Sequence, residues 1–222
     1  MDVADRLAAI RATIPSGVKL VAVSKFHPVE ALREAYDAGQ RLFGESRAQE
    51  LSAKYGQMPS DVEWHFIGHL QTNKVRQIIP CVSMIHSVDS VKLLNCIDAE
   101  ARRAGRTVDV LLQLHVAQEV TKSGMTPDEC VELAEAGSFG GLMNVRVRGV
   151  MGMATFTDDL DQVRGEFRSI RRTFLRLKSG YFAGDDNFSE ISMGMSDDYR
   201  VAIDEGSTLV RIGTSIFGPR QY

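Results

Sequence analysis

Polar and charged residues follow several apolar runs of this 222-residue chain, at the positions where buried strands would end. Lys25 is the clearest case, because it comes directly after the run LVAVS. A lysine at the rim of a buried strand can form a Schiff base if its surroundings lower its pKa and free the nitrogen lone pair. A solvated lysine at the end of a strand is the simpler alternative.

A phosphate site is predicted near the C-terminus, in the segment RIGTSIFG at 211–218. Gly213 would let a ligand approach the backbone closely, and Thr214 adds a hydroxyl beside backbone N–H groups. The preceding segment SMGMSDD supplies Ser192 and Gly194 from a neighbouring strand. Barrels of alternating strands and helices commonly bind phosphate after their last two strands. Turns and tight packing are the alternative explanation for these glycines.

Metal ligation is not predicted. His65 and His69 have the spacing of a helical pair, but they straddle Gly68 at a strand end and should point in different directions. The three cysteines are scattered and form no CxxC pair, which indicates reduced thiols in a cytoplasmic protein rather than structural zinc: Cys81, Cys96 and Cys130.

Composition indicates an ordinary globular protein. Hydrophobic residues make up 44% and charged residues 25% of the chain, and 26 Lys and Arg against 29 Asp and Glu give a net charge of −3. This balance gives no reason to expect nucleic acid or a membrane surface as a partner. No apolar stretch reaches the roughly 18 residues that span a bilayer, and the N-terminus lacks the apolar core of a secretory signal. We expect one domain over residues 1–222, acting as a monomer in the cytoplasm.

The elements that must position these residues repeat in a regular order. A β-rich run, a polar turn and an amphipathic helical stretch recur eight times, with strands predicted at Lys19–Ser24, Arg41–Gly44, Glu63–Ile67, Val82–Ser87, Val108–His115, Arg146–Met151, Glu190–Ser192 and Thr208–Ile212. Several of these runs are continuously apolar, which is typical of parallel strands buried on both faces. The pattern predicts an α/β fold, a single (β/α)8 TIM barrel with an extra N-terminal helix. A doubly wound open sheet is the rival, because periodicity does not reveal strand order.

Two helix starts are marked by capping residues. Thr126, Pro127 and Glu129 form a capping box with proline at the first helical position. Ser196, followed by two aspartates, is expected to cap a helix that ends at Gly206.

From Val18 to the C-terminus, seven motifs resemble those of the pyridoxal-phosphate homeostasis proteins, which are alanine-racemase-N-terminal-domain-like, in order and spacing. They are LVAVSKFHP, FGESRAQE, WHFIGHLQTNK, IHSVDS, GVMGMATFTDD, ISMGMSDDY and STLVRIGTSIFGPR. The resemblance implies a fold-type III barrel that binds pyridoxal 5'-phosphate (PLP). It also implies that Lys25 holds PLP as an aldimine and that Arg211 faces the pyridine nitrogen. Ser192, Gly213 and Thr214 look like the phosphate binders.

Three positions bear on the finer contacts. Ser46 stands where relatives often have asparagine, so we expect it to bind near the cofactor ring through a shorter side chain. His27 replaces a lysine that is frequent in the family two positions after the aldimine lysine. Lys122 matches another family lysine and is a candidate for a secondary PLP contact.

The leading hypothesis is a PLP-binding protein that acts in PLP homeostasis without efficient catalysis, and that releases the cofactor to apo-enzymes. Arginine is always protonated and cannot accept the proton of the pyridine nitrogen, so the ring should stay neutral and stabilise a carbanion poorly. Racemisation needs an acid/base group on each face of the substrate carbon. Alanine racemases bring a tyrosine from a second domain, and we expect no such domain after Tyr222.

Three alternatives remain open. The first is a PLP-dependent amino-acid (alanine) racemase of low activity. The second is an aldolase-like barrel in which Lys25 forms a Schiff base with a phosphorylated sugar, without PLP. The third is a pure interaction protein, which no exposed basic or aromatic stripe supports.

Overall fold

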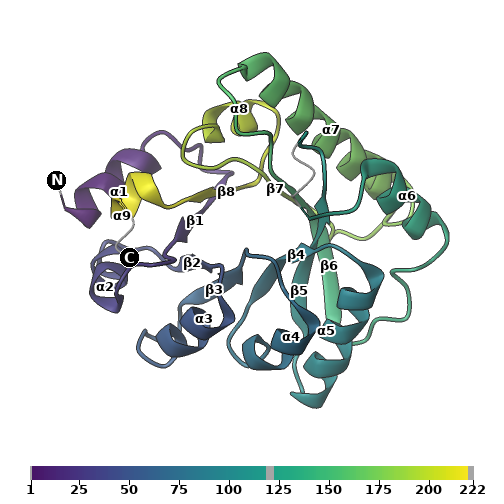
Figure 1. The fold of residues 1–222 in the computed structure, drawn as a ribbon, viewed down its shortest axis with the longest axis horizontal. Coiled ribbons are helices and arrows are strands. Elements are labelled where there is room, and N and C mark those ends of the chain that lie inside the picture. Colours follow the sequence, from purple (N-terminus) through teal and green to yellow (C-terminus); the bar gives the residue numbers. More distant parts are fainter. Residues whose placement is uncertain (1, 119–122, 220–222) are drawn as a thin grey trace.

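The computed structural model describes residues 2–118 and 123–219, and within them eight parallel strands close into one barrel (Figure 1). In chain order the strands are β1 (Lys19–Val23), β2 (Leu42–Glu45), β3 (Glu63–Phe66), β4 (Met84–Val88), β5 (Val108–Leu114), β6 (Val145–Gly152), β7 (Glu190–Ser192) and β8 (Leu209–Ile212). Each strand pairs with the next, and β1 pairs with β8 from Lys19↔Leu209 to Ala22↔Ile212. This closure confirms the predicted (β/α)8 barrel and excludes the open sheet.

The helices surround the barrel (Figure 1). They are α1 (Val3–Arg11), α2 (Val29–Asp37), α3 (Ala48–Tyr55), α4 (Thr72–Ile78), α5 (Val91–Arg103), α6 (Pro127–Glu135), α7 (Leu160–Ser179), α8 (Tyr199–Asp204) and α9 (Thr214–Phe217). The extra N-terminal helix is α1, and it lies beside α9, where Arg6 Nε donates to the Ile216 carbonyl at 2.6 Å. The capping box of α6 is confirmed: the Thr126 hydroxyl accepts from the Glu129 N–H, and the Glu129 carboxylate accepts from the Thr126 N–H.

Two predicted boundaries are wrong in ways that matter for the site. Strand β4 begins at Met84 and ends at Val88, instead of running from Val82 to Ser87, so His86 lies at the centre of the strand. Helix α8 begins at Tyr199 with Asp198 at its N-cap position, so Ser196 is not the cap. The Asp198 carboxylate accepts the N–H of Met195 at 2.6 Å, and this bond turns the loop before the helix starts. Ser196 therefore stays in the loop.

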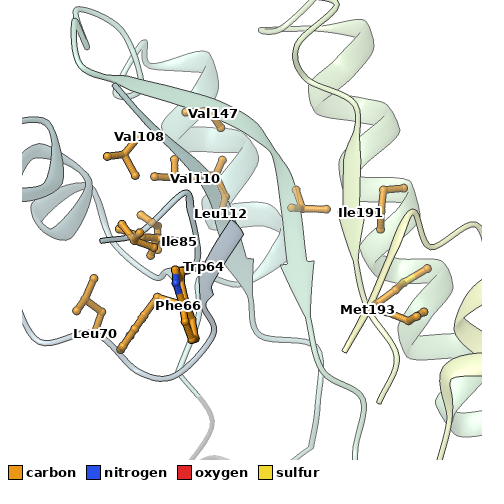
Figure 2. Close-up of a cluster of buried hydrophobic side chains, with 14 of the residues drawn as sticks. Trp64, Phe66, Leu70, Ile85, Val108, Val110, Leu112, Val147, Ile191 and Met193 are labelled. Atoms are coloured by element: carbon orange, nitrogen blue, oxygen red, sulfur yellow. The ribbon is translucent and has the colours of Figure 1, made fainter. Parts of the chain in front are cut away.

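Hydrophobic side chains fill two separate spaces. Those that point outward from the strands pack under the helices, as Figure 2 shows for Trp64, Ile85 and Val110. A smaller group fills the barrel interior: Val21, Met84, Leu111, Met151 and Leu209. The alternation follows the period of two along a strand, so Val110 faces the helices while Leu111 faces inward. The interior is thus a packed core, and a ligand must bind at an end of the barrel.

Across residues 2–118 and 123–219, no helix combines the length and the apolar character needed to cross a membrane.

Candidate functional site

A pocket opens where the strands end at their carboxyl sides. It is lined by five of the residues that the sequence singled out, namely Lys25, Ser46, Arg211, Gly213 and Thr214. Its apolar wall comes from Val23, Ile67, Met153 and Met195. His27 and Ser196 complete the polar lining. Residues of β1 and β8 and of the loops after β1, β2, β3, β6, β7 and β8 therefore meet in one place, although they are far apart in sequence.

The backbone after β1 is strained in a way that places Lys25. Phe26 has φ = 66°, and it is the only non-glycine residue with a positive φ among the residues that the structure describes. This conformation costs an L-amino acid about 1–2 kcal/mol and persists only where neighbours hold it. The Phe26 N–H donates to Glu50 Oε2 at 2.9 Å, and the Arg47 guanidinium lies 4.5 Å from the Phe26 ring centre. Helix α3 thus holds the turn that follows Lys25.

An ionic network anchors the same turn. Lys54 Nζ donates to Glu45 Oε1 at 2.7 Å, to the Ser24 carbonyl at 2.9 Å and to Glu50 Oε2 at 3.3 Å. Glu45 is fully buried, and its second bond comes from the Ser24 hydroxyl at 2.7 Å. Burial raises the pKa of Glu45, while the Lys54 charge and hydrogen bond oppose that rise. The network joins β2 and α3 to Ser24, the residue that follows β1 and precedes Lys25.

Arg211 forms the charged floor of the pocket. Its Nη1 donates to the Ser192 hydroxyl at 2.5 Å, and its Nη2 donates to the Gly152 carbonyl at 3.1 Å. Burial lowers the pKa of Arg211 to about 10, and the negative charge of Asp198 works against that change. The guanidinium therefore stays protonated at neutral pH and offers only N–H donors.

Ser192 does not line the pocket. Its hydroxyl is fully buried beneath the floor, where it bonds to Arg211 and to His86 Nδ1 at 3.0 Å. Phosphate contact by this side chain remains a prediction, and the structure gives the hydroxyl other partners. Ser196, which sequence reasoning expected as a helix cap, lies on the pocket wall instead. The only signal for it was its place four residues after Ser192 in SMGMS.

Two close backbone approaches shape the rim. A Cβ on Gly213 would lie 2.9 Å from the Val23 carbonyl oxygen, so this position must lack a side chain for β8 to end against β1. A Cβ on Gly68 would lie 2.3 Å from the Ser46 carbonyl oxygen, so Gly68 lets the loop with Ser46 fold onto the pocket. His27 is buried, and its ring stacks on Phe217 at 5.2 Å between centres.

The remaining sequence candidates lie elsewhere. His65 is buried in the barrel interior, whereas the His69 side chain is 59% exposed and lies 3.4 Å from Asp89, so the two do not form a pair. Among the residues described, no group of three or more His, Cys, Asp or Glu side chains is placed to hold a metal ion. Lys122 falls outside the described residues.

The pocket suits a flat aromatic ligand that carries an aldehyde and a phosphate. Lys25 supplies a primary amine, and Arg211 supplies a buried cation. Thr214 and Ser196 supply hydroxyls beside the open backbone at Gly213, and the apolar wall can cover a ring. These donor types match the PLP that the sequence motifs imply.

Comparison with known proteins agrees with this fit. Residues 2–221 match the family described as alanine racemase, N-terminal domain. A pyridoxal phosphate homeostasis protein of Aquifex aeolicus (strain VF5) is 41% identical over 205 residues, which are 92% of this chain and 88% of the relative. The structure of PipY from Synechococcus elongatus PCC7942 with PLP bound is 38% identical, with a TM-score of 0.87 over 98% of this chain and 100% of that chain.

A more distant structure shows the fold alone. Alanine racemase from Clostridium difficile 630 in complex with cycloserine has a TM-score of 0.75 but only 14% identity, and the match spans 100% of this chain and 60% of that one.

Proposed function

The chain belongs to the pyridoxal phosphate homeostasis proteins of the alanine racemase N-terminal domain family, and we propose that it binds PLP reversibly through Lys25. The observation that carries the proposal is the convergence of Lys25, Arg211 and Thr214 on one pocket. The PLP-bound PipY relative supports the choice of ligand. The function is to hold and release the cofactor, as PLP homeostasis requires.

Each polar residue of the pocket has a distinct task. PLP supplies an aldehyde that condenses reversibly with a primary amine, and Lys25 is the amine of this pocket. Thr214, Ser196 and the backbone at Gly213 bind the phosphate. Arg211 faces the ring nitrogen as a donor, and it holds its own proton because its pKa of about 10 is well above neutral pH. Ser46 contacts the ring edge.

Efficient catalysis is not part of the proposal. The titratable side chains on the pocket wall, within the described part of the chain, are Lys25, His27 and Arg211. Arg211 stays protonated, and His27 is buried in a stack on Phe217. Removal and return of a substrate proton on opposite faces needs two groups that can exchange protons. Among these lining residues, the only group besides Lys25 that could serve is His27, whose ring packs against Phe217. We expect no deuterium in L-alanine incubated with the PLP-loaded protein in D2O beyond that caused by free PLP. Clear excess exchange would favour the racemase.

Borohydride reduction followed by peptide mass mapping tests the site. The wild-type protein incubated with PLP should carry one phosphopyridoxyl group, on Lys25. Lys25→Ala should lose the adduct and keep its fold, while the matched variant of an exposed lysine, Lys92→Ala, should keep the adduct. An adduct on a different lysine in Lys25→Ala would overturn the assignment. Absence of any adduct in folded wild type would overturn PLP binding and leave the aldolase-like barrel.

The same proposal predicts the partners, the location and the oligomeric state of the protein. Apo-enzymes that need PLP are the expected recipients. Transfer is measured as the activity that an apo-enzyme recovers from the PLP-loaded protein, once with the two proteins mixed and once with a dialysis membrane between them. We expect a cytoplasmic monomer whose 222 residues unfold as one cooperative unit, with a mass in solution near 24.5 kDa.

A further inference from the structure

A chain of buried polar side chains crosses the barrel interior and ends at the floor of the pocket. His65 Nδ1 lies 2.8 Å from His86 Nε2, and His86 Nδ1 lies 3.0 Å from Ser192 Oγ. Ser192 Oγ in turn accepts from Arg211 Nη1 at 2.5 Å. All four residues are buried, and they come from β3, β4, β7 and β8. None of the pocket's ligand contacts requires the two histidines.

We call the hydrogen-bonded side chains of Arg211, Ser192, His86 and His65 the relay. Each of its hydrogen bonds can be assigned a donor and an acceptor. Arginine has only donors, so Ser192 Oγ accepts the bond from Arg211. The Ser192 hydroxyl proton then needs an acceptor, and His86 Nδ1 is its only other partner in the described residues. His86 therefore carries its proton on Nε2 and donates to His65 Nδ1. The opposite direction would leave the hydroxyl proton buried without an acceptor, at a cost of about 1–3 kcal/mol.

Charge supports the same assignment, because both rings are neutral. Burial, together with the positive charge of Lys19, lowers the pKa of His65 to about 3. Burial lowers the pKa of His86 well below its usual value, and the neighbouring His65 and Arg211 reinforce the effect. Neutral imidazoles can pass on a directional hydrogen bond without adding a second cation beside Arg211. A serine oxygen that donates its own proton is also a stronger acceptor, since chains of hydrogen bonds polarise one another.

We propose that His86 and His65 are positioning residues that fix the Ser192 hydroxyl as an acceptor and so orient the Arg211 guanidinium toward the pocket. The relay would set the direction in which Arg211 presents its remaining donors to the ligand. Its effect on cofactor binding rests on the proposed function, since it concerns the group that faces the ring nitrogen. The hydrogen-bond direction itself does not depend on PLP.

The direction is tested on the ligand-free wild-type protein by long-range ¹H–¹⁵N NMR of histidine rings, which reports the tautomer of each ring. We expect Nε2-protonated, neutral rings for both His65 and His86, assigned by comparison with His65→Asn and His86→Asn. A proton on Nδ1 of His86, or a charged ring at pH 7, would overturn the relay whether or not PLP binds.

The effect on the site is tested by equilibrium binding of PLP and of its carbocyclic analogue, in which CH replaces the ring nitrogen. His86→Leu removes both histidine bonds and should weaken PLP binding about tenfold, with a much smaller effect on the analogue. His86→Asn, whose amide oxygen can replace Nδ1 as an acceptor for Ser192, should recover most of the loss. Leu111→Ala is the control for a destabilised barrel interior and should weaken both ligands equally or not at all.

The possible results distinguish the direction of the hydrogen bonds from their effect on PLP binding. Equal weakening of PLP and analogue in His86→Leu would mean that the histidines only support the fold. If wild type binds neither ligand, the proposed function fails while the NMR result still decides the relay. If His86→Leu does not fold, the comparison of His86→Asn with wild type decides: PLP binding of His86→Asn within about threefold of wild type supports the relay, and uniform loss for both ligands contradicts it.

Discussion

Two buried polar networks lie next to the pocket, one beside Lys25 and one beside Arg211, and their chemistry differs. Beside Lys25, the Lys54 ammonium bonds to the carboxylates of Glu45 and Glu50. Beside Arg211, two neutral histidines and a serine lead through the barrel interior. The first network is ionic and joins a helix to two strands. The second is uncharged until its last member and stays within the sheet.

The difference follows from what each network holds. Lys54 must keep a strained turn in place, and a buried ion pair does so strongly because a charge left without its partner is costly. The histidines lie beside a cation that is already buried, where another full charge would be repelled. A neutral relay therefore orients the Arg211 guanidinium but contributes less to the stability of the fold. We therefore expect the ionic network to dominate stability and the relay to dominate the response to pH and the orientation of Arg211.

The largest effect is expected from breaking the ionic network. Lys54→Met leaves the fully buried Glu45 without its cation and should lower the free energy of unfolding by about 3–5 kcal/mol, measured by urea denaturation. The loss should be greater at pH 8 than at pH 5. Burial already raises the pKa of Glu45, and without Lys54 the folded protein binds a proton there more tightly than the unfolded chain, so its stability falls as pH rises.

The double variant Glu45→Leu with Lys54→Met is the control for this prediction. It removes both charges and replaces them with apolar groups, so it should be more stable than Lys54→Met alone. If the single variant lost less than about 1 kcal/mol, the two networks would not differ in strength, and the comparison would fail.

The relay should make the free energy of unfolding decrease at acidic pH. His65 has a folded pKa of about 3 against about 6.5 in an unfolded chain, so the unfolded state binds more protons between these values. Stability should therefore fall as pH drops below about 6.5, by about 1.4 kcal/mol per pH unit for each such histidine. Unfolding curves at pH 7, 6 and 5 measure the slope. His65→Asn should remove one histidine's share of it, whereas His69→Asn, at an exposed ring, should leave it unchanged.

The strained turn gives a smaller effect. Phe26→Gly and Phe26→Ala lose the same ring contact with Arg47, but only glycine adopts φ = 66° without steric cost. Phe26→Gly should therefore be more stable than Phe26→Ala by about 1 kcal/mol, after allowing for the greater freedom of glycine in the unfolded chain. Thermal unfolding of the two variants measures the difference. Equal stability would show that Glu50 does not hold the turn against strain.

Some of this arrangement could be predicted from the sequence. Strand ends are visible in a sequence because apolar runs stop there, which singles out Lys25, Gly213 and Thr214. The family resemblance adds Ser46 and Arg211, and all five residues line one pocket. Eight repeats of one pattern predicted parallel strands covered by helices, but the pairing of β1 with β8 that closes the barrel came only from the structure, because periodicity does not reveal strand order.

The supporting networks could not be predicted in this way. His65 and His86 sit inside strands, and no local signal tells an inward histidine that joins a relay from one that simply packs. Which ring meets which depends on the barrel register, as in the pairing of His65 with Met84. A serine before two aspartates is a common helix cap, so the sequence predicts Ser196 at that position. The loop bond from Met195 to Asp198 overrides that preference.

The smallest effect is expected from an ion pair outside both networks, and it isolates the role of burial. Arg146 Nε lies 2.7 Å from the Asp109 carboxylate, the same distance as Lys54 from Glu45, but its side chain is 55% exposed against 9% for Lys54. Arg146→Ala should cost less than about 1 kcal/mol, and the cost should shrink further in high salt because water and ions screen exposed charges. Urea denaturation at low and high salt, beside Lys54→Met under the same conditions, measures both. If the exposed pair proved as costly to break as the buried one, desolvation could not explain the strength of the network beside Lys25. A short ionic bond at either place would then be sufficient.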